Sequence, residues 1–142
     1  MKPILCLSEA SRARIGGWAE NGYPQESCGL MLGARGPGGV RVEQVTEARN
    51  VNTERPHDRY EVAPEAFLAA DELAEQLGLE VVGVWHTHPD QPAQPSETDR
   101  TGAWAGWSYL ILSVVGGKVL DLRSWRFDAE HFFEETVRTW QP

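Results

Sequence analysis

The chain contains only two cysteines, Cys6 and Cys28, among 142 residues. Two isolated cysteines do not make a disulfide framework, so the class of small secreted proteins stapled by disulfides is excluded. Reduced thiols are typical of an intracellular protein, and the sequence therefore favours the cytoplasm.

Long apolar segments and an excess of basic residues are also missing. The apolar run 4–7 is too short for the core of a signal peptide, and the acidic Glu9 follows it closely. No segment approaches the length of a membrane span. The net charge is −8, which argues against a nucleic-acid-binding protein because such proteins usually carry a basic patch.

Two histidines stand at the end of a predicted buried strand. Residues 80–85 (EVVGVW) form a short, largely apolar and β-branched run, and His86 and His88 follow it. Side chains two residues apart on an extended chain point to the same face, so both imidazoles can reach one metal ion. A His-x-His pair alone is also compatible with an ordinary polar strand edge.

A carboxylate and a hydroxyl follow the two histidines. The segment 89–95 holds three prolines and is predicted to be a loop. Ser96 is then typical of a helix N-cap, with Asp99 in the first turn of a short helix. Two histidines and one carboxylate are common ligands of catalytic zinc, which keeps its fourth position open for water.

The residues Glu26, His86-x-His88 and, after seven further residues, Ser96-x-x-Asp99 resemble the JAMM motif of the MPN-plus (JAB-domain) zinc metalloproteases. The resemblance runs from about residue 24 to 115 and includes ESCGLMLG, NVNTERPHDRYEV and VVGVWHTHP. The short chain is most similar to the small prokaryotic members, which act on ubiquitin-like sulfur-carrier proteins.

The resemblance implies a role for each motif residue. His86, His88 and Asp99 would hold one Zn²⁺ per chain. Glu26 would take a proton from the attacking water and pass it to the leaving amine, and Ser96 would hydrogen-bond the oxyanion of the tetrahedral intermediate. Metal-activated water then needs no covalent enzyme intermediate.

The remaining candidate residues have simpler interpretations. Cys28 lies two residues from Glu26, but a nucleophilic cysteine needs a histidine as its base and both motif histidines are better used as ligands. We therefore expect Cys28 to be a small core residue. His57 is expected in a solvated loop, and His131 at the surface or in packing.

Hydrophobic periodicity and turn residues predict the secondary structure. The predicted strands are 4–7, 28–32, 40–48, a brief 60–62, 80–85, 107–115 and 119–127, and the longer predicted helices are 8–21, 64–77 and 128–140. Residues 1–142 are predicted to form a single domain. Its class is α/β, a sandwich with a mixed central sheet flanked by about three helices, and the family resemblance implies a cytidine-deaminase-like architecture.

These features predict a zinc metallopeptidase or isopeptidase that hydrolyses the amide bond after the C-terminal Gly-Gly of a ubiquitin-like or sulfur-carrier protein. It would release cysteine or tail residues, or act like a deubiquitinase on lysine conjugates. A noncatalytic MPN scaffold is the alternative from another class, although all five motif positions are filled. A zinc deaminase is rejected because the chain has no Cys-x-x-Cys pair.

Overall fold

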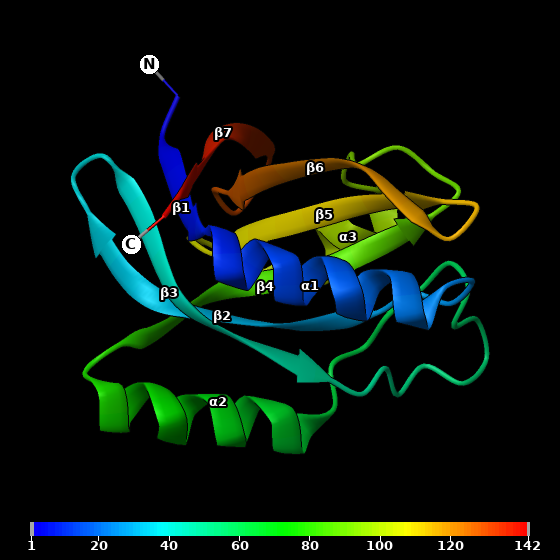
Figure 1. The fold of residues 1–142 in the computed structure, drawn as a ribbon, viewed down its shortest axis with the longest axis horizontal. Coiled ribbons are helices and arrows are strands. Elements are labelled where there is room, and N and C mark those ends of the chain that lie inside the picture. The colour runs from blue at the N-terminus through cyan, green and yellow to red at the C-terminus, as the bar shows by residue number, and fades with distance from the viewer. Residues whose placement is uncertain (1, 142) are drawn as a thin grey trace.

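Seven strands of one mixed sheet and three helices make up residues 2–141, the part of the chain that the computed structural model describes (Figure 1). The strands are β1 (Ile4–Ser8), β2 (Cys28–Gly36), β3 (Gly39–Ala48), β4 (Glu80–Pro89), β5 (Ser108–Val115), β6 (Lys118–Phe127) and β7 (Phe132–Trp140). The helices are α1 (Glu9–Gly22), α2 (Pro64–Leu77) and α3 (Glu97–Thr101). The predicted α/β class, with a mixed sheet and three helices, is confirmed.

The sheet closes on itself. The strand order is β1-β3-β2-β4-β5-β6-β7, and β7 returns to pair with β1. The pairs β1–β3, β1–β7 and β4–β5 are parallel, and the other neighbours are antiparallel. The sheet is therefore a closed barrel, whereas the sequence predicted a central sheet within a sandwich.

The prediction of a helix over 128–140 is wrong. Asp128 accepts hydrogen bonds from the backbone N–H groups of Glu130 and His131, which is the local pattern that imitates an N-cap. The following residues instead form β7, which pairs with β1 on one side and β6 on the other. Pairing with two neighbouring strands outweighs the weak helical preference of this segment.

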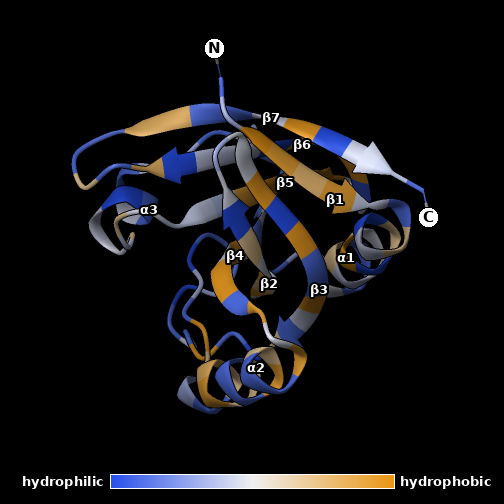
Figure 2. Ribbon diagram, turned by 90° about the vertical axis from the view of Figure 1, so that its left-hand side faces the viewer, coloured by the Kyte–Doolittle hydropathy of each residue, from blue (hydrophilic) through white to orange (hydrophobic). Residues whose placement is uncertain are grey.

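The two long helices lie against different faces of the sheet. Ser8 caps α1, whose residues Ile15 and Ala19 are buried in one apolar cluster with Trp85. Pro64 begins α2, which packs against β2, β3 and β4 within a second cluster. Along β3, apolar and polar residues alternate, as Figure 2 shows, so that one side of the strand is buried. Within residues 2–141, no helix is long and apolar enough to cross a membrane.

Strand β4 directs its side chains to both faces. Trp85 is fully buried, stacks on Trp18 at 5.8 Å and donates its indole N–H to the carbonyl of Thr46. A side chain on Gly29 of β2 would overlap that carbonyl and the indole, so the glycine permits this close packing. β4 continues to Pro89, four residues beyond the predicted strand, and therefore carries both histidines.

The brief strand predicted over residues 60–62 is reduced to an isolated bridge. Asn50 and Val62 pair in antiparallel fashion. The residues between them form the expected loop, which is held closed by hydrogen bonds from the Val51 N–H to the Glu61 carbonyl and from the Ala63 N–H to the Arg49 carbonyl.

Candidate metal centre and active site

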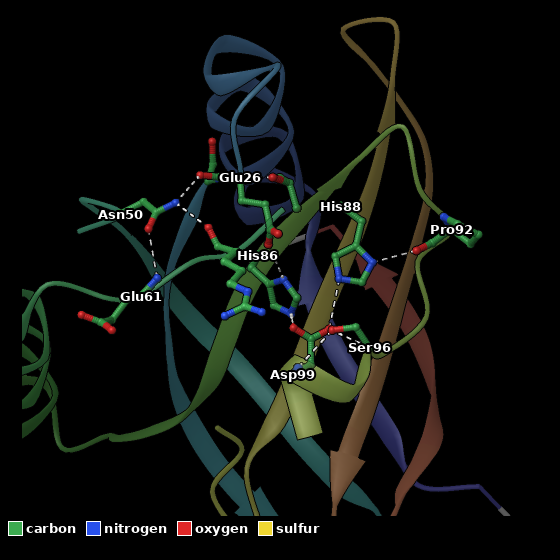
Figure 3. Close-up of polar contacts among 11 residues, drawn as sticks. Glu26, Asn50, Glu61, His86, His88, Pro92, Ser96 and Asp99 are labelled. Atoms are coloured by element: carbon green, nitrogen blue, oxygen red, sulfur yellow. Dashed lines mark hydrogen bonds and ion pairs between the residues drawn. The ribbon is translucent and has the colours of Figure 1, made fainter. Parts of the chain in front are cut away.

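The two histidines lie side by side at the end of β4, as Figure 3 shows. His86 is completely buried and His88 is 8% exposed. Their ring centroids are 5.1 Å apart. Because side chains alternate along a strand, His86 and His88 share the face opposite Trp85 and Thr87.

Asp99 reaches both histidines from the short helix α3. One carboxylate oxygen lies 3.1 Å from His88 Nε2, and the other lies 3.8 Å from His86 Nε2. Ser96 and Asp99 form a capping box: Ser96 Oγ accepts from the Asp99 N–H at 3.0 Å, and Asp99 Oδ2 accepts from the Ser96 N–H at 2.9 Å. The predicted N-cap therefore also orients the carboxylate.

Glu26 approaches from the segment between α1 and β2. The residue is 6% exposed, and its Oε1 atom lies 3.6 Å from His86 Nδ1. The neighbouring Ser27 is fixed to β4, because its N–H donates to Thr87 Oγ1 and its carbonyl accepts from the Thr87 N–H. The structure thus brings Glu26 together with the two histidines, although it is sixty positions earlier in the chain than His86.

The polar atoms of this cluster fit a metal ion. His86 Nδ1, His86 Nε2 and Glu26 Oε1 are buried and have no hydrogen-bond partner among the described residues. Each such atom costs about 1–3 kcal/mol unless a ligand satisfies it. Ligand atoms of Glu26, His86 and His88 all lie within 4.8 Å of one another. Imidazole nitrogens and carboxylate oxygens form the usual donor set of Zn²⁺.

A hydrogen bond fixes the orientation of the His88 ring. His88 Nδ1 lies 2.8 Å from the Pro92 carbonyl, and a carbonyl can only accept, so Nδ1 carries the proton. In the neutral ring, His88 Nε2 then has the lone pair that a metal ion would take; in the protonated ring, the same atom donates to Asp99. An outer hydrogen bond of this kind is common for histidines that bind metals.

Electrostatics favour the charged pair of Asp99 and His88. Burial raises the pKa of Asp99, but the nearby His86 and hydrogen bonds from His88 and Ser96 outweigh that effect and hold the pKa at about 2. Burial lowers the pKa of His88, yet its hydrogen bond to Asp99 raises the pKa above the ordinary histidine value. The carboxylate is therefore ionised at neutral pH and available as a ligand.

An aromatic ring that the sequence did not single out covers His86. Tyr60 stacks on the imidazole with a centroid distance of 4.2 Å and an interplanar angle of 21°. Burial, followed by the charge of Asp99, raises the pKa of the Tyr60 hydroxyl well above its usual value, so Tyr60 stays neutral. The sequence predicted only a brief strand over residues 60–62, and that pattern gave no signal for this contact.

Two cavities flank the cluster. One, of about 400 Å³, is bordered by Asp99 and by aromatic side chains. Its aromatic lining consists of Tyr60, Phe67, Trp104, Trp107 and Tyr109. The other, of about 390 Å³, is bordered by Glu26, His88 and Ser96 together with the proline-rich segment 89–95. Both share Asp58, Arg59 and Thr98.

The other candidate residues lie outside the cluster. Cys28 is fully buried, and burial raises the pKa of its thiol to about 12, helped by the charges of Glu26 and Glu47. A thiol with that pKa is a poor nucleophile at neutral pH, in agreement with a core role. His57 and His131 are both largely exposed.

Comparisons with known proteins agree with the geometry. The family model for prokaryotic homologs of the JAB domain matches residues 8–128. A desampylase from Haloferax volcanii is 37% identical over 109 residues, which are 75% of this chain and 73% of that protein. A probable TtuB-protein conjugate cleaving protease from Thermus thermophilus is 34% identical over 93 residues, 66% of this chain and 59% of that protein.

A solution structure of a protein from Desulfitobacterium hafniense superimposes on nearly the whole fold. The TM-score is 0.84 at 26% identity, with 98% of this chain and 94% of that chain covered. The matched family segment includes the motif from Glu26 to Asp99. The chain belongs to the prokaryotic JAB-domain family.

Proposed function

We propose that this JAB-domain hydrolase is a zinc-dependent isopeptidase that cleaves conjugates of a ubiquitin-like protein after its C-terminal Gly-Gly. The observation that supports the metal most directly concerns His86. Its two buried nitrogens lie beside carboxylates but have no hydrogen-bond partner among the described residues. An ion would take the lone pair of one nitrogen, and the other nitrogen, as N–H, would lie beside the remaining carboxylate.

His86, His88 and Asp99 would hold the zinc ion, one per chain. When bound, zinc supplies Lewis acidity that polarises an amide carbonyl and makes water a nucleophile near neutral pH. Glu26 then acts as the base that accepts the water's proton and returns it to the leaving nitrogen. Ser96 Oγ accepts a backbone hydrogen bond, so its O–H proton remains available to donate to the oxyanion.

The two cavities support opposite roles for the two halves of a conjugate. Glu26 borders only the cavity beside the proline-rich segment. Because Glu26 delivers a proton to the leaving nitrogen, the leaving group would enter that cavity. The cavity lined by Trp104 and Trp107 would then receive the residues on the carrier side. Two glycines at the cleaved bond would let the backbone approach the metal closely, since they have no side chains.

The names of the relatives favour conjugates as the substrate. One is a desampylase and another a probable TtuB-protein conjugate cleaving protease. The same hydrolysis would also release cysteine or tail residues from an extended sulfur-carrier protein, because only the leaving group differs.

We further propose that the enzyme acts in the cytoplasm. Residues 1–142 would form one domain with a cytidine-deaminase-like arrangement.

Intact-mass analysis of model substrates tests the function. A sulfur-carrier protein linked after Gly-Gly to a lysine side chain, and the same carrier extended by cysteine, are incubated with zinc-loaded enzyme with and without a chelator. We expect loss of the mass beyond Gly-Gly only without the chelator. A protein that binds zinc but cleaves neither substrate would contradict this substrate assignment, and one without zinc would support the noncatalytic scaffold.

A further inference from the structure

The amide of Asn50 binds four backbone groups at once. Its Nδ2 donates to the carbonyls of Glu26 at 3.1 Å and Arg59 at 3.0 Å. Its Oδ1 accepts from the N–H groups of Asn52 and Glu61, both at 3.0 Å. Figure 3 shows Asn50 between Glu26 and Glu61. The amide's two donor hydrogens and two acceptor lone pairs are all used.

The backbone of Glu26 is held by this loop. Glu26 comes just before β2 begins at Cys28, so its backbone groups are bonded outside the sheet. Its N–H donates to the Pro56 carbonyl at 2.6 Å, and its carbonyl accepts from Asn50. Both backbone hydrogen bonds of the proposed base therefore come from residues 50–56, while its side chain faces His86.

The same loop also contacts His86 directly. Tyr60, which stacks on His86, follows Arg59, whose carbonyl is the second acceptor of Asn50. One side chain thus links the segment that carries Glu26 to the segment that covers His86. The two histidines themselves are fixed independently, because β4 pairs with β2 and β5.

We propose that Asn50 is a positioning residue for the hydrolytic step, and that it acts by fixing Glu26 relative to His86. The inference rests on the proposed function, in which Glu26 is the base. Loss of the two donor bonds would allow the Glu26 backbone to shift while the zinc ligands stay in place. A displacement of a catalytic group by about 1 Å is enough to lower turnover on the order of 100-fold.

The decisive variant is Asn50→Asp. It keeps the shape and the acceptor oxygen for Asn52 and Glu61, but it places an oxygen instead of an N–H donor toward the Glu26 carbonyl. The matched control is Asn52→Asp, in the same loop and with the same change of charge. Asn52 Oδ1 accepts from the Arg55 N–H, and its side chain has no hydrogen bond to Glu26 among those in the described part of the chain.

We expect Asn50→Asp to lower kcat about 10- to 100-fold, with KM and zinc content close to those of the unaltered enzyme. The new carboxylate adds a negative charge, which shifts mainly the acidic limb of the plot of kcat against pH. We therefore compare kcat values on the plateau of that plot. Asn52→Asp should lower kcat far less. Equal losses in the two variants, or an unchanged kcat in Asn50→Asp, would overturn the proposal.

Amide hydrogen exchange gives a readout that does not depend on activity. In Asn50→Asp, the Glu26 amide, which donates to the Pro56 carbonyl, should exchange faster because the Glu26 carbonyl is no longer held to the loop. The amides of Asn52 and Glu61 keep their acceptor and their protection. Asn50→Ala also removes the acceptor of the Asn52 and Glu61 amides, so these two should exchange faster as well. If the unaltered enzyme cleaves no conjugate, the proposed function fails, and the exchange of the Glu26 amide still decides whether Asn50 positions it. Unchanged protection of that amide would refute the positioning role.

Discussion

At the scale of single residues, His86 explains most about the centre. A buried imidazole normally hydrogen-bonds through both nitrogens, because an unsatisfied buried polar atom is costly. His86 instead has carboxylate oxygens at 3.6 and 3.8 Å, beyond good hydrogen-bond distance. The possible ligand atoms are thus spaced around a common point. This spacing suits a metal ion better than it suits direct hydrogen bonds between the side chains.

Replacing Glu26 by Gln separates catalysis from metal binding. The amide has nearly the same shape but cannot accept the proton of the attacking water, so kcat should fall about 100- to 10,000-fold. Elemental analysis should still find one zinc per chain. Full activity in the variant would remove Glu26 from the role of base, and loss of zinc would make Glu26 a ligand.

Asp99→Ala tests the other carboxylate. The change removes an oxygen that lies within 4 Å of both histidines, so zinc affinity should drop by at least about 10-fold. Measuring zinc content after dialysis against a weak chelator checks the prediction. Because the change also breaks the capping box, Ser96→Ala serves as a control: it removes the cap and should retain zinc.

Alkylation distinguishes Cys28 from a nucleophile. With its pKa raised to about 12, Cys28 has almost no thiolate at pH 8, and the folded enzyme should keep its activity during exposure to iodoacetamide. Peptide mass spectrometry should find Cys28 unmodified until the protein is unfolded. Rapid inactivation together with modification of Cys28 would contradict the metal mechanism.

The sequence allowed the proximity of His86, His88 and Asp99 to be predicted, because they share one short segment with strand, loop and cap signals. Glu26 could be joined to them only through the family resemblance, since local rules do not place distant segments together. Tyr60 and Asn50 were missed. A stacking ring and a bridging amide have no motif of their own, and their roles depend on where the loop folds back.

At the scale of elements, β7 shows how tertiary pairing overrides local preference. The segment 128–140 has a capping aspartate and spaced apolar residues that suit a helix. In the structure, Glu135 of β7 is 1% exposed and accepts hydrogen bonds from Ser124 and Arg126 of β6. Both partners of this buried carboxylate lie on the neighbouring strand. The propensity of a single residue for helix or strand does not include such contacts.

Glu135→Ala should therefore destabilise the fold. The change leaves Arg126 without its carboxylate partner, and such losses commonly cost about 3 kcal/mol in the free energy of unfolding. Urea denaturation followed by tryptophan fluorescence measures it. The adjacent Glu134 forms exposed ion pairs with Lys2 and Arg123, so Glu134→Ala should cost only about 0.5 kcal/mol. Equal effects of the two changes would argue against the buried pair.

At the scale of the whole molecule, one misassigned element changed the predicted architecture. Had 128–140 been a helix, β1 and β6 would each have kept an unpaired edge. As a strand, β7 joins both edges and closes the sheet. The long helices cover different faces of this sheet: α1 packs with one apolar cluster and α2 with another.

The metal centre should contribute to the stability of the whole fold. The proposed ligands lie on β4 and α3, so a bound ion would link two parts of the chain that unfolding separates. A ligand that binds only the folded state at about 1,000 times its Kd adds about 4 kcal/mol to the free energy of unfolding. For a chain of this size, that corresponds to a rise in Tm of roughly 10 °C.

Differential scanning calorimetry with zinc and with a chelator measures this shift. Glu26→Gln should retain the zinc-dependent rise, because in the proposed mechanism the base does not hold the ion. His86→Ala should lose it, although that variant should also unfold at a different temperature without zinc. The comparison within each variant, zinc against chelator, removes that difference. An undiminished rise in His86→Ala would place the stabilising ion away from this cluster, since no ion held by His86 can survive removal of its imidazole unchanged.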